Sequence, residues 1–374
     1  MSSYTLYTTI HYILNMTDFT AETDSKYDLI VKDLQGVFNG DSLKSIIAGG
    51  AVPRVYWGTA PTGKIHLGYI IQSLKLRDIV NAGCELIILI ADLHAFLDSQ
   101  KSEESQIEAR SEYYIKLMRS LLARLGVDLE KVKFVKGTSF QLNEEYTMDV
   151  YRLGSRTTYN HCKHAGSEVV KQEKNVPMTN LMYPILQALD MVHLKCDAFI
   201  GGNDQIKINS FGMDFLSSIG YTQRYTYLMT PMIAGISTKK QDVAVKMSSS
   251  GDSSKVELLF TPEEIKKAIS KAYCLEKDVD DNSLLKLCKN LVFKLTNEFP
   301  TVKYDGETKT CLPFKTYTSY DELEKDFALG SVDGGLHPAD FKDSMTNFFV
   351  DFLKPIRDDF DNDDARELIR RAYP

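Results

Sequence analysis

The 374-residue sequence has no long apolar run, no closely paired cysteines, no internal repeat and no low-complexity tract. Its longest apolar run, Leu86 to Ala91, is far shorter than the roughly 18–20 residues that cross a bilayer, so we expect no membrane contact. The six cysteines are widely scattered without a C-x-x-C pair, which argues against a disulfide framework or a zinc ribbon. This cysteine usage is typical of a reducing compartment, and we expect a cytoplasmic protein.

The sequence also lacks a net positive charge, because its 51 Asp and Glu residues outnumber its 44 Lys and Arg residues. The net charge of −7 is unusual for a protein that binds nucleic acid, whose affinity depends on phosphate contacts. Because only the local field at a docking face matters, the net charge does not exclude RNA as a partner. Residues 4–16 contain no Lys or Arg and therefore lack the pattern of a signal or transit peptide. We expect residues 1–23 to form a flexible N-terminal extension, with Met16 as an alternative start.

Strand and helix patterns alternate in the first part of the chain. Apolar side chains at helical spacing predict a first helix over residues 24–38, which Gly40 would end. After it we predict strands at residues 54–57, 86–90 and 133–135, with helices from about residue 66 to 81 and from 103 to 125. This alternation predicts a parallel sheet with helical crossovers, in which ligands bind at the C-terminal ends of the strands.

The second part of the chain changes in character. Residues 141–195 are predicted to be mainly helical, and a strand at residues 197–200 is predicted to follow them. Residues 230–254 are rich in Gly, Ser and Lys and indicate a mobile loop. Thr261 to Glu264 form a capping-box pattern that predicts a helix to Cys274, and a further helix is predicted at about residues 340–354. We therefore predict one domain over residues 24–257 and a smaller, mostly helical domain over residues 258–374.

The first candidate motif, Pro61 to Tyr69, lies between a predicted strand and a predicted helix. A helix N-terminus carries unpaired N–H groups and the positive end of the helix dipole, so it suits a phosphate group. An imidazole at this place, such as His66, can donate to a charge that develops on phosphorus. Taken alone, a connecting turn with one surface histidine is the simpler interpretation.

A second candidate is Lys246 to Ser250, within the Gly/Ser/Lys-rich loop. A lysine on a mobile loop can close over a triphosphate and stabilise departing pyrophosphate. In isolation, this composition indicates a solvated linker.

A third candidate is the segment Tyr183 to Asp190. In a helix, Tyr183, Gln187 and Asp190 share one face, where a phenol, an amide and a carboxylate would form the wall of a pocket for a small polar molecule. An exposed helix face is the plainer alternative. A fourth candidate, Gly201 to Gln205, follows a predicted strand at the edge where a parallel sheet places ligands.

These motifs, in this order, resemble those of the class I aminoacyl-tRNA synthetases, and within them the tyrosyl branch of eukaryotic and archaeal type. His66 to Tyr69 is similar to the HIGH signature, and Lys246 to Ser250 is similar to the KMSKS signature in its KMSSS form. Three further segments resemble the tyrosyl branch: Val55 to Ala60, Ala91 to Asp98 and Tyr183 to Asp190. The resemblance covers about residues 27–357. It implies an α/β fold, with a Rossmann-like parallel-sheet catalytic domain and a mostly helical, C-terminal anticodon-binding domain.

The resemblance also implies roles for single residues. Those expected to bind L-tyrosine are Tyr56, Tyr183, Gln187, Asp190, Gln205, His94 and Ala91. Those expected to bind ATP are Gly58, Thr62, His66, Gly68, Lys246, Met247 and Ser248, of which His66, Lys246 and Thr62 would act in catalysis. The implied reaction is attack of the tyrosine carboxylate on the α-phosphorus of ATP, followed by transfer of the tyrosyl group to the terminal adenosine of tRNA(Tyr). Positioning and charge stabilisation carry this chemistry without a protein nucleophile.

The implied partners extend beyond the small molecules. Mg²⁺ would accompany ATP without a dedicated protein metal site. A homodimer would form through the helical insertion at about residues 141–182, and Asp340 would contact the wobble base of the anticodon. Ile206 departs from the family, which usually has an arginine there that helps to read the acceptor stem, so the sequence leaves that recognition open. Ser249 replaces the second lysine of the KMSKS form, as occurs in the tyrosyl branch.

Three rival interpretations remain open at this point. A tryptophan–tRNA ligase has the same architecture, although Tyr56, Gln187 and Asp190 together favour tyrosine. A non-catalytic paralogue would only bind RNA or proteins and would not need both His66 and Lys246. A nucleotidyltransferase would share the H-x-G turn, but it would need neither the amino-acid pocket nor tRNA.

Overall fold

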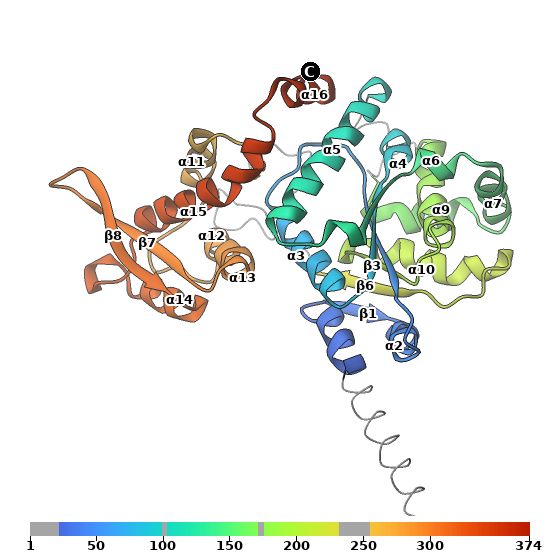
Figure 1. Cartoon of the computed structure of the whole chain (residues 1–374), viewed down its shortest axis with the longest axis horizontal. Helices are drawn as coiled ribbons and strands as arrows, with labels where there is room; N and C mark the ends of the chain where they lie inside the picture. The colour runs from blue at the N-terminus through green and yellow to red at the C-terminus, as the bar shows by residue number, and fades with distance from the viewer. Residues whose placement is uncertain (1–21, 99–102, 171–175, 232–254) are drawn as a thin grey trace, which may run out of the picture.

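The computed structural model describes residues 22–98, 103–170, 176–231 and 255–374. A six-stranded sheet forms its centre, in the strand order β1-β6-β5-β2-β3-β4 (Figure 1). The strands are β1 (Gly36–Phe38), β2 (Arg54–Thr59), β3 (Glu85–Ile90), β4 (Val132–Lys136), β5 (Ala198–Gly202) and β6 (Thr226–Thr230). Only β1 runs antiparallel to its neighbour, β6. The strand order reverses between β2 and β5, and a crevice for ligands opens at such a point.

Helices cover both faces of the sheet. One face carries α3 (Gly68–Asn81) and α5 (Glu104–Arg124), and the other carries α9 (Met178–His193) and α10 (Ile206–Phe215). Side chains alternate along each strand, so Val55 and Trp57 join the core under α3 and α5. Tyr56, between them, points to the opposite face and packs with the core under α9. This alternation places the Tyr56 phenol next to the face of α9 that carries Asp190.

Short helices fill the connections around α9. Two of them, α7 (Glu144–Gly154) and α8 (Tyr159–Ala165), fall within residues 141–195, which were predicted to be mainly helical. The others are α4 (Asp92–Leu97) and α6 (Thr138–Gln141), and α2 (Gly40–Ala48) precedes β2. Asn143 caps α7 by accepting a hydrogen bond from Tyr146 N, and Thr158 caps α8 in the same way from His161 N. The caps fix where these helices begin and therefore where Tyr146 lies beneath the pocket.

The remaining part of the chain is mostly helical. Its helices are α11 (Pro262–Ser270), α12 (Ser283–Leu287), α13 (Phe293–Leu295), α14 (Tyr320–Leu329), α15 (Pro338–Asp359) and α16 (Asp363–Ala372). The capping box at Thr261 and Glu264 is confirmed, with two reciprocal hydrogen bonds of 2.8 and 3.2 Å. A hairpin of β7 (Phe299–Asp305) and β8 (Thr310–Tyr317) was not expected from the sequence. The chain then returns, and α16 lies along α5 (Figure 1).

Several predicted boundaries are wrong. In the described part of the chain, the first helix ends at residue 31, and residues 36–38, predicted as its last turn, form β1. At the end of that helix, the Lys75 ammonium donates to the carbonyl groups of Leu29 and Lys32 at 2.8 and 2.7 Å. Gly40 begins α2 instead of ending a helix. The helix predicted from about residue 66 to 81 is confirmed as α3, whereas the one predicted to reach residue 274 ends at Ser270.

The domain boundary near residue 258 stays a prediction. The apolar cluster that includes Val55 and Leu86 of the sheet continues without a break to Phe299 and Phe341. Of the predicted extension, residues 1–21 lie outside the described residues, and residues 22 and 23 belong to the first helix. In the described ranges, no helix combines the length and the apolar character that a membrane span requires.

Candidate active site

A cavity of about 680 Å³ lies where β2, β3, β5 and β6 end, as expected for a parallel sheet. Thr59, Ala91, Gly202 and Thr230, at or just after those strand ends, all line it. Ten of the residues proposed from the sequence line this cavity: Tyr56, Gly58, His66, Gly68, Ala91, His94, Tyr183, Gln187, Asp190 and Gln205. Segments that lie far apart in the sequence therefore meet at one site, and no single motif could have shown this.

Asp190 lies at the floor of the cavity and is 1% exposed. Its Oδ1 atom accepts a hydrogen bond from Gln141 Nε2 at 2.6 Å and lies 2.8 Å from the Tyr146 hydroxyl group. That hydroxyl group also lies 2.8 Å from the carbonyl oxygen of Leu186, so the two acceptors share its proton. On the other side of the carboxylate, Oδ2 lies 3.8 Å from His94 Nε2, which is too long for a hydrogen bond. Oδ2 therefore keeps its capacity to accept a hydrogen bond from a bound molecule.

Burial dominates the electrostatics at this floor. It raises the pKa of Asp190 to about 7, against the lowering effect of the hydrogen bonds from Gln141 and Tyr146. Burial also lowers the pKa of His94 to about 4, so this imidazole is neutral at pH 7. The pKa of the Tyr56 phenol is raised by burial and by the nearby Asp190 carboxylate, so the phenol keeps its proton. Among the described residues, the Tyr56 hydroxyl group has no hydrogen-bond partner.

The side wall of the cavity is polar. Tyr183, Gln187 and Asp190 lie on one face of α9 at the predicted spacing, and all three line the cavity. Gln187 Nε2 donates to Gln205 Oε1 at 2.9 Å, which joins α9 to the turn after β5. The Tyr183 ring meets the His94 ring edge-on at 4.6 Å and so fixes both side chains. Amide and phenol oxygens beside one another suit a small cation such as an α-ammonium group.

His66 lies at the other end of the cavity, just before α3. Its Nδ1 atom accepts a hydrogen bond from Gly68 N at 3.2 Å, so the proton of the neutral ring is on Nε2. Burial, with a smaller effect of the Lys255 charge, lowers the pKa of His66 to about 4. The side chain is therefore a neutral hydrogen-bond donor at pH 7.

The segment before α11 is joined to this end of the cavity. Leu67 N donates to Val256 O, and Leu258 N donates to Ile65 O, both at 3.0 Å. Pro231, which follows β6, also lines the cavity. Lys246, Met247 and Ser248, proposed from the sequence for ATP, fall between these two anchored positions and lie outside the described residues.

Two other predicted residues lie outside the cavity lining. Thr62 is in the turn between β2 and α3, where its carbonyl oxygen accepts a hydrogen bond from Arg110 Nη1 at 2.8 Å. Asp340 lies in the first turn of α15, and its Oδ1 atom accepts a hydrogen bond from Tyr304 N at 2.8 Å. Asp340 thus holds the start of α15 against the β7–β8 hairpin.

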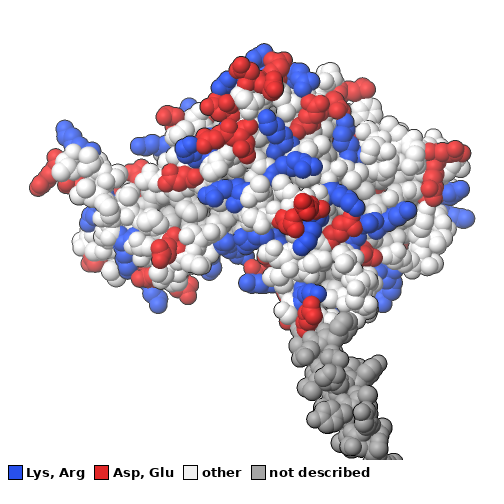
Figure 2. Space-filling view, viewed as in Figure 1, with Lys and Arg blue, Asp and Glu red and all other residues white. Residues whose placement is uncertain are grey.

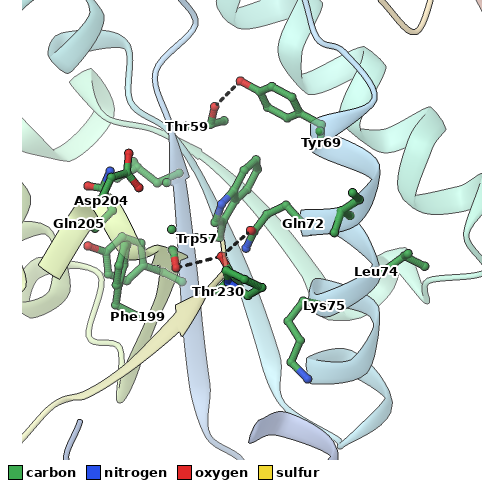
Figure 3. A pocket seen from close by; sticks show the side chains of 18 of the residues that line it. Trp57, Thr59, Tyr69, Gln72, Leu74, Lys75, Phe199, Asp204, Gln205 and Thr230 are labelled. Atoms are coloured by element: carbon green, nitrogen blue, oxygen red, sulfur yellow. Dashed lines mark hydrogen bonds between the residues drawn. The ribbon is translucent and has the colours of Figure 1, made fainter. Parts of the chain in front are cut away.

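Sequence reasoning missed other groups at the cavity wall or directly behind it. Gln141 and Tyr146 orient Asp190, yet they lie 49 and 44 residues from it in the sequence. The hydroxyl group of Thr230, at the end of β6, donates to Gln72 Oε1 of α3 at 3.0 Å (Figure 3). No local pattern marks these residues, because a long-range hydrogen bond has no characteristic sequence spacing.

Comparisons with known proteins agree with this geometry. A family model of class I tRNA synthetases (W and Y) matches residues 50–354. The cytoplasmic tyrosine–tRNA ligase of Gallus gallus is 43% identical over 352 residues, which are 93% of this chain and 63% of that protein. A probable cytoplasmic tyrosine–tRNA ligase of Encephalitozoon cuniculi is 38% identical over 94% of this chain and 99% of its own length.

Solved structures give the same family. The crystal structure of the tyrosyl-tRNA synthetase from Archaeoglobus fulgidus, complexed with L-tyrosine, has a TM-score of 0.74 and 30% identity. It covers 90% of this chain, and the match spans 99% of that one. The chain spans somewhat less than two thirds of the length of the Gallus gallus relative. The match over residues 50–354 and the identities above 30% show that this chain belongs to the class I tRNA synthetases of the tryptophan and tyrosine group.

Proposed function

We propose that this chain is a tyrosine–tRNA ligase, which activates L-tyrosine with ATP and transfers the tyrosyl group to tRNA(Tyr). The observation that carries the proposal is the pair of polar groups at the floor of the cavity, Asp190 and Tyr56. A phenol hydroxyl group can donate to Asp190 Oδ2 and accept from the Tyr56 hydroxyl group at the same time. Phenylalanine would leave both groups buried without a partner, which costs free energy.

The same floor separates tyrosine from tryptophan, the other substrate of this family group. An indole N–H can donate to Asp190, but it cannot accept a hydrogen bond from Tyr56. The relatives named above are tyrosine enzymes, which supports the same choice. Tyrosine is therefore the substrate that satisfies both groups.

The remaining groups of the cavity suit the activation step. Tyr183, Gln187 and Gln205 would orient the α-ammonium group, so that the substrate carboxylate faces the α-phosphorus of ATP. His66 would donate through Nε2 to the charge that develops on the phosphate, and its low pKa keeps it in the neutral donor form. Gly58 and Gly68 let the nucleotide approach the backbone. Lys246 would stabilise the leaving pyrophosphate, a role that rests on the KMSSS signature.

Mg²⁺ would enter with ATP. In the parts of the chain that the structure describes, no group of three or more His, Cys, Asp or Glu side chains is arranged to hold a metal ion. A nucleotide-bound Mg²⁺, held mainly by phosphate oxygens and water, fits such a site. When bound, it would neutralise charge on the phosphates.

The tRNA is the macromolecular partner that this proposal requires. Although the net charge is −7, Lys and Arg side chains lie across the middle of one face of the molecule, with Asp and Glu side chains among them (Figure 2). Lys and Arg side chains on this face are available for contact with phosphate groups. Asp340 would contact the anticodon through Oδ2, since Oδ1 already accepts from Tyr304 N. Ile206, at the start of α10, leaves the acceptor-stem contact to other residues.

A homodimer formed through α7 and α8 is also part of the proposal. Met148 and Tyr151 share one face of α7 and are 43% and 65% exposed, and Leu142, just before α7, and Tyr159, at the start of α8, are also exposed. Large apolar side chains that gather on a surface mark an interaction site. These side chains fall within the helical insertion where the family resemblance places the contact, so a second copy of this chain is the proposed occupant.

The cytoplasm is the proposed location, in line with the names of the relatives.

The test is ATP–pyrophosphate exchange with the purified chain, measured with tyrosine, tryptophan and phenylalanine in turn. Exchange with tyrosine alone is expected. Exchange with tryptophan would transfer the assignment to the other branch of the family, and no exchange from folded protein would favour a non-catalytic binding protein. Charging of tRNA(Tyr) with labelled tyrosine then separates a ligase from a nucleotidyltransferase, which has no need of tRNA.

A further inference from the structure

The turn between β2 and α3 has its carbonyl groups held by other parts of the chain. Thr62 O accepts a hydrogen bond from Arg110 of α5. Gly63 O accepts two, from the Tyr114 hydroxyl group at 2.6 Å and from the Tyr373 hydroxyl group at 2.8 Å. Because a carbonyl oxygen has two lone pairs, Gly63 O is fully satisfied.

Tyr373 follows α16 and is firmly docked on α5. Its ring lies 4.9 Å from the Arg110 guanidinium and meets the Tyr113 ring edge-on at 5.3 Å. Arg110 Nε also donates to the carbonyl oxygen of Ala372 at 2.9 Å. Arg110 therefore bridges the end of α16 and the turn, and Tyr373 contacts the turn 310 residues away in the sequence.

Tyr114 links the turn to the cavity wall. Since Tyr114 donates its one proton to Gly63 O, Tyr69 must donate to Tyr114, across 3.3 Å. Thr59 must then donate to Tyr69, across 3.1 Å (Figure 3). The chain of hydroxyl groups runs from the end of β2 through α3 and α5 to Gly63.

These contacts fix the direction of two backbone N–H groups. In a planar trans peptide, the N–H group points opposite to the carbonyl group that precedes it. The N–H groups of Gly63 and Lys64 therefore point away from α5 and α16, and among the described residues neither has a hydrogen-bond partner. Ala60 and His66, on either side of the turn, line the cavity. Successive free N–H groups beside a helix start form a concave site for an anion.

We propose that Tyr373 is a positioning residue for ATP: with Arg110 and Tyr114, it holds the carbonyl groups of the turn so that the N–H groups of Gly63 and Lys64 face the triphosphate. This inference rests on the proposed function for the identity of the anion. It makes the end of α16 a part of the nucleotide site. Tyrosine binds at the opposite end of the cavity, next to Asp190, and does not depend on Tyr373.

The experiment compares the Tyr373→Phe variant with the unaltered protein. The phenylalanine ring keeps the contacts with Arg110 and Tyr113, and only the hydrogen bond to Gly63 O is lost. The KM for ATP in the exchange reaction and the Kd of a non-cleavable α,β-methylene ATP analogue, from calorimetry, are both expected to rise about two- to tenfold, as for loss of one hydrogen bond. The KM for tyrosine is expected to stay the same.

Arg371→Gln is the matched control. Arg371 pairs with Glu112 at 2.9 Å in the same α16–α5 contact but does not touch the turn. Three results would each overturn the proposal. The Tyr373→Phe variant could keep the ATP affinity of the unaltered protein, or Arg371→Gln could lose as much ATP affinity as Tyr373→Phe. The third is a rise in the KM for tyrosine that equals the rise in the KM for ATP. If the unaltered protein shows no exchange, the proposed function fails, and calorimetry with the ATP analogue still decides the role of Tyr373.

Discussion

The Tyr146 hydroxyl group lies 2.8 Å from Asp190 Oδ1, beneath the pocket, and both side chains are buried. Together with Gln141, it occupies one oxygen of the carboxylate and leaves the other for a ligand. Tyr146 itself does not line the cavity. It is thus placed to act on a substrate through Asp190 alone.

Replacing Tyr146 with Phe is therefore expected to raise the KM for tyrosine by about three- to tenfold, because one hydrogen bond to the carboxylate is lost. The pKa of Asp190 should rise further, so the acid limb of kcat/KM for tyrosine should move to higher pH. The KM for ATP should not change. Pyrophosphate exchange at several pH values measures all three quantities.

Tyr221→Phe is the matched control for this variant, because it removes a hydroxyl group that donates to Asp149 and not to Asp190. A pH profile that shifts equally in both variants would point to a general loosening of the helices around α7. A profile that does not move in Tyr146→Phe would contradict the role assigned to Tyr146.

Asp190→Asn tests the recognition of the substrate hydroxyl group directly. The amide oxygen can still accept from Gln141 and Tyr146, but the charged acceptor for the phenol is lost. A hydrogen bond to a charged group contributes about 1.5–3 kcal/mol, so kcat/KM for tyrosine should fall roughly 10- to 100-fold. The pH dependence of this quantity near pH 7 should disappear with the carboxyl group. Retention of the full kcat/KM would remove Asp190 from the proposed tyrosine site.

Although Asp190→Asn should lower activity, the same substitution should stabilise the folded chain at high pH. The pKa of Asp190 is about 7 in the folded chain and near 4 in an unfolded one, so the folded state binds this proton more tightly. The stabilisation that comes from this tighter proton binding is fully present below about pH 4 and is lost as the pH rises through 7. The Asn side chain of the Asp190→Asn variant does not titrate. The free energy of unfolding of the variant minus that of the wild type should therefore increase by roughly 2–4 kcal/mol between pH 4 and pH 8.

Asp149 supplies a control of opposite sign. Burial would raise its pKa, but hydrogen bonds from Tyr221, Arg152 and His193 hold the pKa below its usual value. Its contribution to stability is present above the unfolded pKa near 4 and is lost only as the pH falls below that value, so Asp149→Asn should be more destabilising at pH 8 than at pH 3. Urea unfolding at about pH 3, 4 and 8, without tyrosine, measures both variants. A stability difference for Asp190→Asn that does not vary with pH would contradict the raised pKa.

Local patterns accounted for most of what the sequence predicted correctly. The capping box at Thr261 and the strand–turn–helix around His66 are set by neighbours within a few residues, and ten of the proposed site residues do line one cavity. By contrast, β1 was missed because three residues that contain Gly36 show no strand alternation, and its pairing with β6 is distant. The contacts of Gln141 with Asp190 and of Tyr373 with Gly63 depend on the complete fold.

His66 gives a prediction about pH and rate. With a pKa of about 4, it should cause no change in kcat for exchange between pH 6 and 9, because its charge is constant there. His66→Ala should lower kcat about 100- to 1,000-fold, as for loss of one donor to a developing charge, and should barely change the KM for tyrosine. His164, an exposed histidine on α8, provides the control substitution to Ala. An unchanged kcat in His66→Ala would exclude it from the activation step.

The exposed face of α7 leads to the last prediction. If Met148 and Tyr151 are covered by a second copy of this chain, a charge at either place must be buried without a partner, which strongly disfavours association. Tyr151→Glu should therefore convert a dimer into a monomer in sedimentation experiments at micromolar concentration. Val332→Glu places the same charge at a residue that is 90% exposed and far along the chain, and it should leave the dimer intact. A Tyr151→Glu variant that stays dimeric would place the interface elsewhere, because the new charge would then remain in water in the dimer. A monomeric wild-type protein would exclude the interface altogether.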